Sequence, residues 1–101
     1  RHELAAWTAR QQDPRPVREE LMIRLRASAV LDGPSPEPEL RRHLRLHLQQ
    51  LQTYLDLKEQ TFPPGPPHRA SQLQLAVLEA GITFERAWIA WAEETLEALQ
   101  P

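Results

Sequence analysis

Residues 71–99 lie in the longest stretch of the chain without proline, and their apolar side chains recur at the three- and four-residue spacing of an α-helix. Two apolar stripes run along this stretch. One comprises Leu73, Val77, Phe84, Trp88 and Trp91, and the other comprises Leu75, Leu78, Ile82, Ile89, Leu96 and Leu99. A helix of this length extends for about 40 Å. Because a helix with two apolar faces must be covered from two sides, and a short chain has few other elements, the pattern predicts a partner chain.

The composition is that of one small domain. The chain has 101 residues, ten prolines, three glycines, no cysteine and a net charge of −2. The lack of cysteine excludes a disulfide scaffold and a cysteine-rich metal site, and it favours a cytoplasmic location. No apolar run is long enough to cross a bilayer and no signal-peptide pattern is present, so we expect no membrane partner. The slightly negative charge argues against nucleic-acid binding by this piece of chain.

Prolines divide the rest of the chain into shorter helical segments. Residues 1–12 have a weak apolar edge and predict a short helix, which Pro14 ends because proline lacks an N–H. The next helix is expected at about 16–29, since Glu19 and Glu20 in its first turn suit the positive end of the helix dipole. The Asp-Gly-Pro sequence that follows is typical of a helix end.

A third helix is expected between Ser35, a candidate N-cap, and the proline-rich residues 63–67. Its apolar stripe comprises Leu40, Leu44, Leu48, Leu51, Leu55 and Phe62. Leu46 and Leu57 lie off this stripe, which predicts a second contact surface on the same helix. No period-two pattern indicates a strand. The sequence therefore predicts an all-α fold: two short helices followed by a long antiparallel helical hairpin, dimerising through the long C-terminal helices.

Glu39, His43 and His47 lie four residues apart on the third predicted helix. This spacing can bring metal ligands onto one helix face. The surrounding sequence RRHLRLH is strongly basic, however, which disfavours a bound cation, and no glutamate lies inside the histidine pair to act as a base. An ordinary solvated face is the favoured interpretation, so the sequence predicts no metal site and no cofactor.

Arg41, Arg42 and Arg45 cluster near the start of the same helix. Such a cluster can contact DNA phosphates or an acidic partner. The favoured interpretation is again a solvated face beside the leucine stripe, or pairing with the acidic residues of the last helix.

Glu93, Glu94 and Glu97 are the carboxylates that most resemble a catalytic group. General acid–base catalysis needs positioned carboxylates in a water-poor pocket. These three lie near the end of the chain, where we expect them to face water. The sequence therefore predicts that the protein is not an enzyme.

Trp88 and Trp91 lie three residues apart on the last predicted helix. Aromatic side chains bury a large area, so packing in the core or in a dimer interface is the favoured role. The alternative is a platform for a flat ligand between subunits. Gly81, with Ala76 and Ala80 nearby, allows a close helix crossing, although simple tolerance of a mid-helix glycine explains it equally well.

Residues 14–25 (PRPVREELMIRL) and 75–99 resemble the C-terminal domain of PadR-like transcriptional regulators, also called the virulence-activator-alpha C-terminal domain. The matching residues are Val17, Arg18, Glu20, Leu21 and Leu25 in the first segment, and Gly81, Ile82, Trp91, Glu93 and Glu94 in the second. The opening RHELAAW also looks like the segment that follows the wing of the DNA-binding domain in that family.

The resemblance implies a dimeric, cytoplasmic bacterial regulator whose N-terminal winged helix reads DNA. Its C-terminal helices would dimerise and set the spacing of the two winged helices, and in some relatives the dimer interface takes up a small aromatic effector. The winged helix is absent from this chain. We therefore expect residues 1–15 to be a linker helix after a missing winged-helix domain, and residues 16–101 to be a helical dimerisation domain.

The predicted partners are a second copy of the chain, DNA only through the missing domain, and a small aromatic effector. The candidate dimer interface comprises Leu75, Leu78, Ile82, Phe84, Trp88, Ile89, Trp91 and Leu96. The candidate effector-binding residues are Trp88 and Trp91. Two other functions stay open: a stand-alone helical adaptor that binds a partner helix in its groove, and a small-molecule sensor domain.

Overall fold

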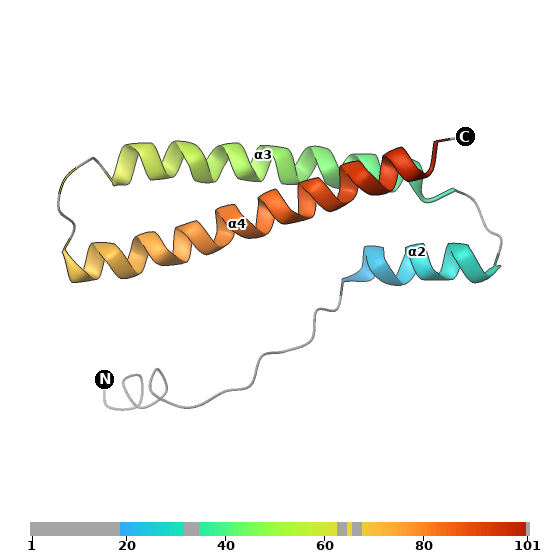
Figure 1. The fold of residues 1–101 in the computed structure, drawn as a ribbon, viewed down its shortest axis with the longest axis horizontal. Helices are drawn as coiled ribbons and strands as arrows, with labels where there is room; N and C mark the ends of the chain where they lie inside the picture. Colours follow the sequence, from blue (N-terminus) through green and yellow to red (C-terminus); the bar gives the residue numbers. More distant parts are fainter. Residues whose placement is uncertain (1–18, 32–34, 63–64, 66–67, 101) are drawn as a thin grey trace, which may run out of the picture.

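The computed structural model describes residues 19–31, 35–62, 65 and 68–100 of the chain (Figure 1). These residues form three α-helices, α2 (Glu20–Leu31), α3 (Glu37–Thr61) and α4 (Arg69–Ala98), and no strand occurs among them. The all-α prediction is confirmed for this part of the chain. The helix predicted at residues 1–12, and with it the linker predicted at 1–15, lies outside the described residues.

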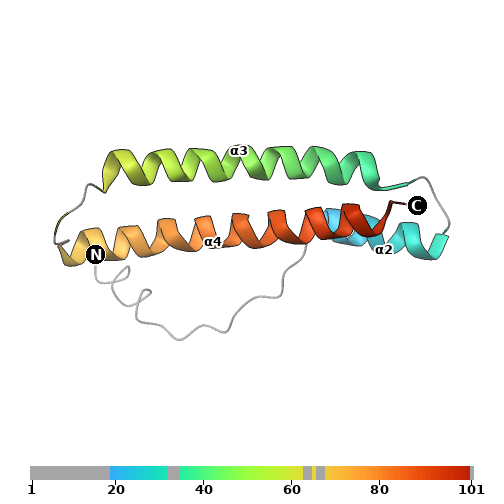
Figure 2. The same cartoon turned by 45° about the horizontal axis from the view of Figure 1, so that its top comes forward.

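The two long helices, α3 and α4, pack against each other and lie side by side with their chain directions opposed (Figures 1 and 2). The short helix α2 lies beside the end of this pair where α3 begins and α4 ends (Figure 1). None of the three helices is both long enough and apolar enough to cross a lipid bilayer.

The boundaries of α3 and α4 agree closely with the positions of the prolines, whereas the helix expected at about 16–29 is observed as α2 at Glu20–Leu31 within the described residues. Helix α3 ends at Thr61, just before the proline-rich residues, and α4 covers almost all of the expected stretch. The prediction of Ser35 as the N-cap of α3 is wrong, because Pro36 occupies that position and has no side-chain donor or acceptor. Ser35 nevertheless accepts a hydrogen bond from the backbone N–H of Glu37 at 3.2 Å, and so satisfies one of the open amides of the first turn.

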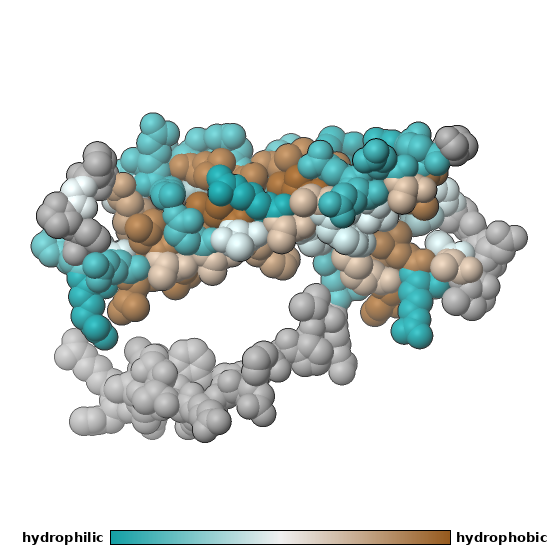
Figure 3. All heavy atoms as spheres, in the orientation of Figure 1, coloured by the Kyte–Doolittle hydropathy of each residue, from teal (hydrophilic) through white to brown (hydrophobic). Residues whose placement is uncertain are grey.

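The main apolar core lies where all three helices meet. Its buried members are Leu21, Leu40, Trp88, Ala92 and Leu96, with Leu25, Leu44 and Trp91 packed against them. Burying one leucine-sized side chain contributes roughly 1.5–3 kcal/mol. Because α2 is much shorter than α3 and α4, it covers only this end of the pair. Apolar surface gathers over the parts of α3 and α4 that α2 does not reach (Figure 3).

Gly81 marks a close approach between α4 and α3. A Cβ atom at this position would lie only 3.0 Å from Cε2 of the Tyr54 ring. The absence of a side chain therefore lets the ring of Tyr54 lie against the backbone of α4. Of the two interpretations of this glycine, the close helix crossing is the one that the structure supports.

Gly81→Val is expected to lower the free energy of unfolding by about 1–3 kcal/mol, the usual cost of overpacking. The β-branched side chain is stiff, so it must displace the Tyr54 ring. The matched control is Ala80→Val, which changes an exposed position in the same turn and lowers helix propensity, whereas Gly81→Val raises it. Urea unfolding followed by circular dichroism measures both. If Gly81→Val is as stable as the control, then the close approach of α4 to the Tyr54 ring does not contribute to the free energy of unfolding.

Candidate functional site

A polar cluster interrupts the apolar contact between α3 and α4. Glu85 of α4 is only 6% exposed, and among the described residues it is the buried charged side chain. Its Oε2 lies in a short hydrogen bond with Nδ1 of His47 on α3. A buried carboxylate is costly unless it has a partner. The pairing with His47 therefore explains how α4 can turn a glutamate toward its neighbour.

Trp88 joins this cluster to the apolar core. Its ring stacks on the imidazole of His47 with the ring centroids 3.9 Å apart, and the Trp91 ring meets it edge-on at 5.5 Å. The indole N–H of Trp88 donates a hydrogen bond to Oε2 of Glu19 at 3.3 Å. Buried tryptophans usually find such a partner for their N–H. Glu19, the residue before α2, is thereby tied to α4.

His43 lies one turn before His47 on α3 and faces the same junction. Its Nε2 is 3.2 Å from Oε1 of Glu39, and its Nδ1 is 3.9 Å from Oε1 of Glu19. The prediction of an ordinary solvated face is wrong for both histidines, because both are half-buried and their rings stack on Trp88.

A sequence signal for this inward position exists in the heptad spacing of α3. His47 lies seven residues after the fully buried Leu40 and seven before Tyr54, which contacts Gly81 of α4. Residues seven apart share one helix face. The spacing therefore placed His47 on the face that meets α4, although the basic residues beside it indicated solvent.

The arginines beside the histidines are exposed and pair mainly along their own helix. Arg41 hydrogen-bonds Glu37 and Arg42 hydrogen-bonds Glu39, at 2.7 and 2.8 Å. The hydrogen bond from the Arg42 guanidinium holds the pKa of the Glu39 carboxyl below its usual value. Arg45 and the three late carboxylates are exposed, as the sequence predicted: Glu93, Glu94 and Glu97. The described ion pairs do not join these arginines to the acids of α4.

The eight candidate interface residues fall into three environments. Ile82, Trp88, Ile89 and Leu96 are buried within the chain, Leu75, Leu78 and Trp91 are half-buried, and Phe84 is exposed. The four buried side chains are therefore already packed within the single chain. Phe84 belongs instead to a row of exposed apolar side chains along one side of α4, with Leu73 (58% exposed), Val77 (74%) and Phe84 (54%). We call these three residues the open row.

An apolar groove lies beside the open row, at the end of the helix pair away from α2. It has a volume of about 330 Å³ and is lined by Tyr54, Leu57, Thr61, Phe62, Gln74, Val77, Leu78 and Gly81. Leu57, which the sequence placed off the main stripe of α3, forms one wall and is 47% exposed. The exposure of Leu57 agrees with its place off the main stripe, whereas the groove next to Gly81 was not predicted from the sequence.

A second apolar depression lies next to α2. It has a volume of about 300 Å³ and is lined by Met22, Phe84, Ala87, Trp88 and Trp91. Both tryptophans that the sequence proposed as ligand-binding residues thus line one hollow. Its walls are almost entirely apolar, so it suits a flat apolar group and offers little to orient a polar one.

Taken together, these features define a small all-α domain that leaves apolar surface outside its own core. The family model described as virulence activator alpha C-term matches residues 17–100. The chain therefore belongs to this family, the C-terminal region of virulence activator alpha. Comparisons with curated proteins and with solved structures gave no match.

Proposed function

We propose that this chain is the C-terminal dimerisation and effector domain of a PadR-like DNA-binding transcriptional regulator. In this proposal α3 and α4 form the long helical hairpin, the domain pairs with a second copy of itself, and DNA is read by an N-terminal winged-helix domain of the parent protein in the cytoplasm. Membership in the virulence activator alpha family supports the proposal, because its description is that of the C-terminal part of an activator.

The single observation that carries the dimerisation role is the open row. Leu73, Val77 and Phe84 are spaced by four and seven residues, so they lie on one side of α4. The same stripe continues into Trp88 and Trp91, where α2 covers it. Contiguous exposed apolar surface on a soluble domain marks an interaction site.

A second copy of the chain is the occupant that this surface fits. The protruding open row and the concave groove lie side by side, since Val77 belongs to both. A two-fold axis brings the row of one chain to the groove of the other, and the reverse contact follows by symmetry. The ion pair between Lys58 and Glu79 links α3 to α4 and supplies charged side chains near this apolar surface, consistent with a polar rim.

A second candidate function is a small-molecule sensor, favoured by the apolar hollow beneath α2. Phe84 lines this hollow and also belongs to the open row. A flat aromatic molecule seated there would lie at the edge of the proposed dimer interface. This arrangement would couple effector binding to dimer geometry.

The proposal predicts that this chain alone does not bind DNA sequence-specifically, since the DNA-reading part lies elsewhere in the parent protein. A mobility-shift titration with the promoter of the parent gene measures this, with the longer parent protein as the positive control. A mobility shift produced by the chain alone at physiological salt would contradict the proposal that another domain of the parent protein reads the DNA. Non-specific phosphate contacts would not explain such a shift, because they weaken steeply with salt.

A further inference from the structure

Glu19, His43 and His47 each bring one possible metal-ligating atom into a single cluster. These three atoms lie within 4.8 Å of one another. In a tetrahedral zinc site with bonds of about 2.0–2.1 Å, neighbouring ligand atoms lie roughly 3.4 Å apart. The ligand atoms must therefore move closer together for the set to close around an ion. The three side chains are partly sheltered from water, at 29% exposure for Glu19, 26% for His43 and 20% for His47.

The outer nitrogen of each histidine is held by a carboxylate. Glu85 holds Nδ1 of His47, and Glu39 lies 3.2 Å from Nε2 of His43. These contacts leave His47 Nε2 and His43 Nδ1 as the ligand atoms. Histidines that bind metals almost always donate their other N–H to a carboxylate or carbonyl, which fixes the tautomer and the ring orientation. Both histidines of this cluster have such a partner.

The carboxylate ligand is oriented in a similar way. The indole N–H of Trp88 donates to Oε2 of Glu19, while Oε1 of the same group lies 3.9 Å from His43 Nδ1. One oxygen is thus held by α4 and the other lies near His43. The set therefore has supporting contacts to all three ligands, which a chance cluster of surface charges would lack.

The charge around the set favours a cation, although the local sequence is basic. Three carboxylates surround the two histidines, from Glu19, Glu39 and Glu85. Arg42 pairs with Glu39 on the exposed side of α3. Glu39 Oε1 is shared between His43 and Arg42, so the arginine offsets the charge of this carboxylate, and Glu19 and Glu85 supply the remaining negative charge beside the histidines.

We propose that Glu19, His43 and His47 bind a divalent transition-metal ion such as Zn²⁺. Two imidazoles and one carboxylate suit Zn²⁺, Co²⁺ or Ni²⁺, whereas Mg²⁺ prefers an all-oxygen set. Three protein ligands leave a fourth position for water or for a donor atom of a small molecule. The ion joins the residue that precedes α2 to α3, so it fixes the docking of α2 over Trp88. This function is independent of the proposed dimer.

The test uses the untagged 101-residue chain, with Co²⁺ as a spectroscopic probe and Zn²⁺ as the competitor. We expect one Co²⁺ per chain with visible absorption of a tetrahedral site, displacement by Zn²⁺, and a higher melting temperature with Zn²⁺ but not with Mg²⁺. His43→Gln and Glu19→Gln should each weaken binding by about tenfold or more, and Glu39→Gln should weaken it by about tenfold through the orientation of His43.

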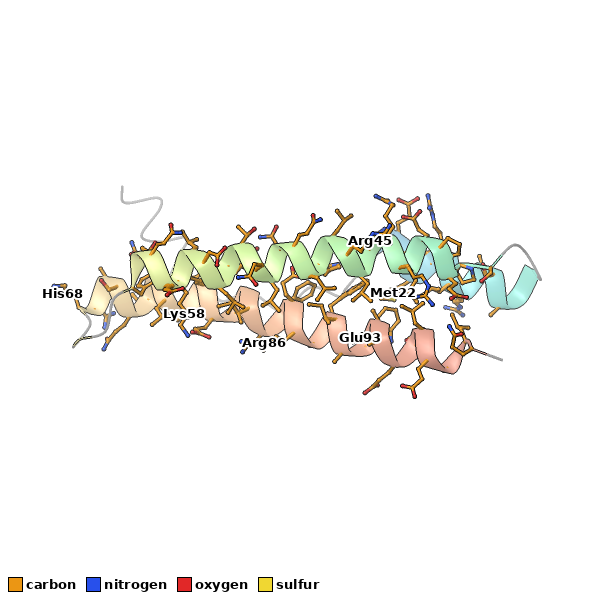
Figure 4. All side chains as sticks on the ribbon, turned by 90° about the horizontal axis from the view of Figure 1, so that it is seen from above. Met22, Arg45, Lys58, His68, Arg86 and Glu93 are labelled. Atoms are coloured by element: carbon orange, nitrogen blue, oxygen red, sulfur yellow. The ribbon has the colours of Figure 1, made fainter. Side chains whose placement is uncertain are left out.

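The matched control is His68→Gln, which removes an exposed histidine at the start of α4. His68 lies at the opposite end of the helix pair from Met22 of α2 (Figure 4). Glu19→Gln keeps an oxygen acceptor for the Trp88 N–H, so it preserves the fold if His43→Gln does not, and circular dichroism checks each variant. The proposal is overturned if the folded Glu19→Gln and Glu39→Gln variants bind as tightly as the original chain, or if Zn²⁺ changes neither the absorption nor the melting temperature.

Discussion

Trp88→Ala is expected to lower the free energy of unfolding by about 3–5 kcal/mol, the usual cost of truncating a buried tryptophan. Trp88 is buried at the meeting point of the three helices, where it contacts Trp91, stacks on His47 and donates to Glu19. A small domain has a total stability of only about 5–15 kcal/mol. The variant is therefore expected to lose a large part of the stability of the chain and to melt at a markedly lower temperature.

The matched control for this prediction is Arg86→Ala, which truncates an exposed side chain two positions earlier on α4. Exposed substitutions of this kind usually change stability by less than about 0.5 kcal/mol. Thermal and urea unfolding of the two variants measure the difference. Equal melting temperatures would mean that Trp88 is not part of the core, and the ligand platform would then be the better explanation of the tryptophan pair.

Val77→Asp is expected to break the proposed dimer without unfolding the chain. Val77 is 74% exposed in the single chain, so a charge there costs little when the chain is alone. In the proposed interface the carboxylate is buried without a partner, and the two-fold axis doubles the effect. Central interface residues typically contribute about 2 kcal/mol or more, so we expect at least a thirtyfold weaker association.

Gln72→Asp is the control for Val77→Asp, because it introduces the same charge at an exposed position away from the open row. Size-exclusion chromatography with light scattering, over a range of concentrations, measures both variants. If Val77→Asp associates as strongly as Gln72→Asp, then the open row does not form the interface.

The sequence predicted the helices well because prolines and apolar spacing act locally. The start and end of α3 and the start of α4 follow from proline-rich segments that cannot continue a helix. The resemblance to the virulence-activator-alpha C-terminal domain agrees with the family match over residues 17–100, whereas the PadR-like assignment stays a proposal. Predicting these features did not require knowing which helix packs against which.

The sequence could not predict which residues of the α4 stripes are buried and which are exposed, because periodicity defines a helix face but not the element that packs against it. Trp88 and Phe84 lie on the same stripe, yet Trp88 is buried and Phe84 is exposed. The difference arises because α2 is short and docks through Leu21 at one end of the pair. Nothing in the spacing within residues 71–99 indicates where α2 stops.

The histidine cluster shows a second limit of local sequence interpretation. The basic residues around His43 and His47 indicated solvent, but the partner of His47 is Glu85, 38 positions further along the chain. Only the crossing of α3 and α4 brings the two together. Glu19 enters the same cluster through the docking of α2, which local patterns do not reveal.

In the proposed dimer, this domain pairs with a second copy through the open row and the adjacent groove. Sedimentation equilibrium of the unmodified chain, from low to tens of micromolar concentration, measures this pairing. The proposal predicts a mass that rises to twice that of one chain, 11.7 kDa, and stays there at higher concentration. A mass that remains that of a single chain over the whole range, with a cooperative melt, would contradict it.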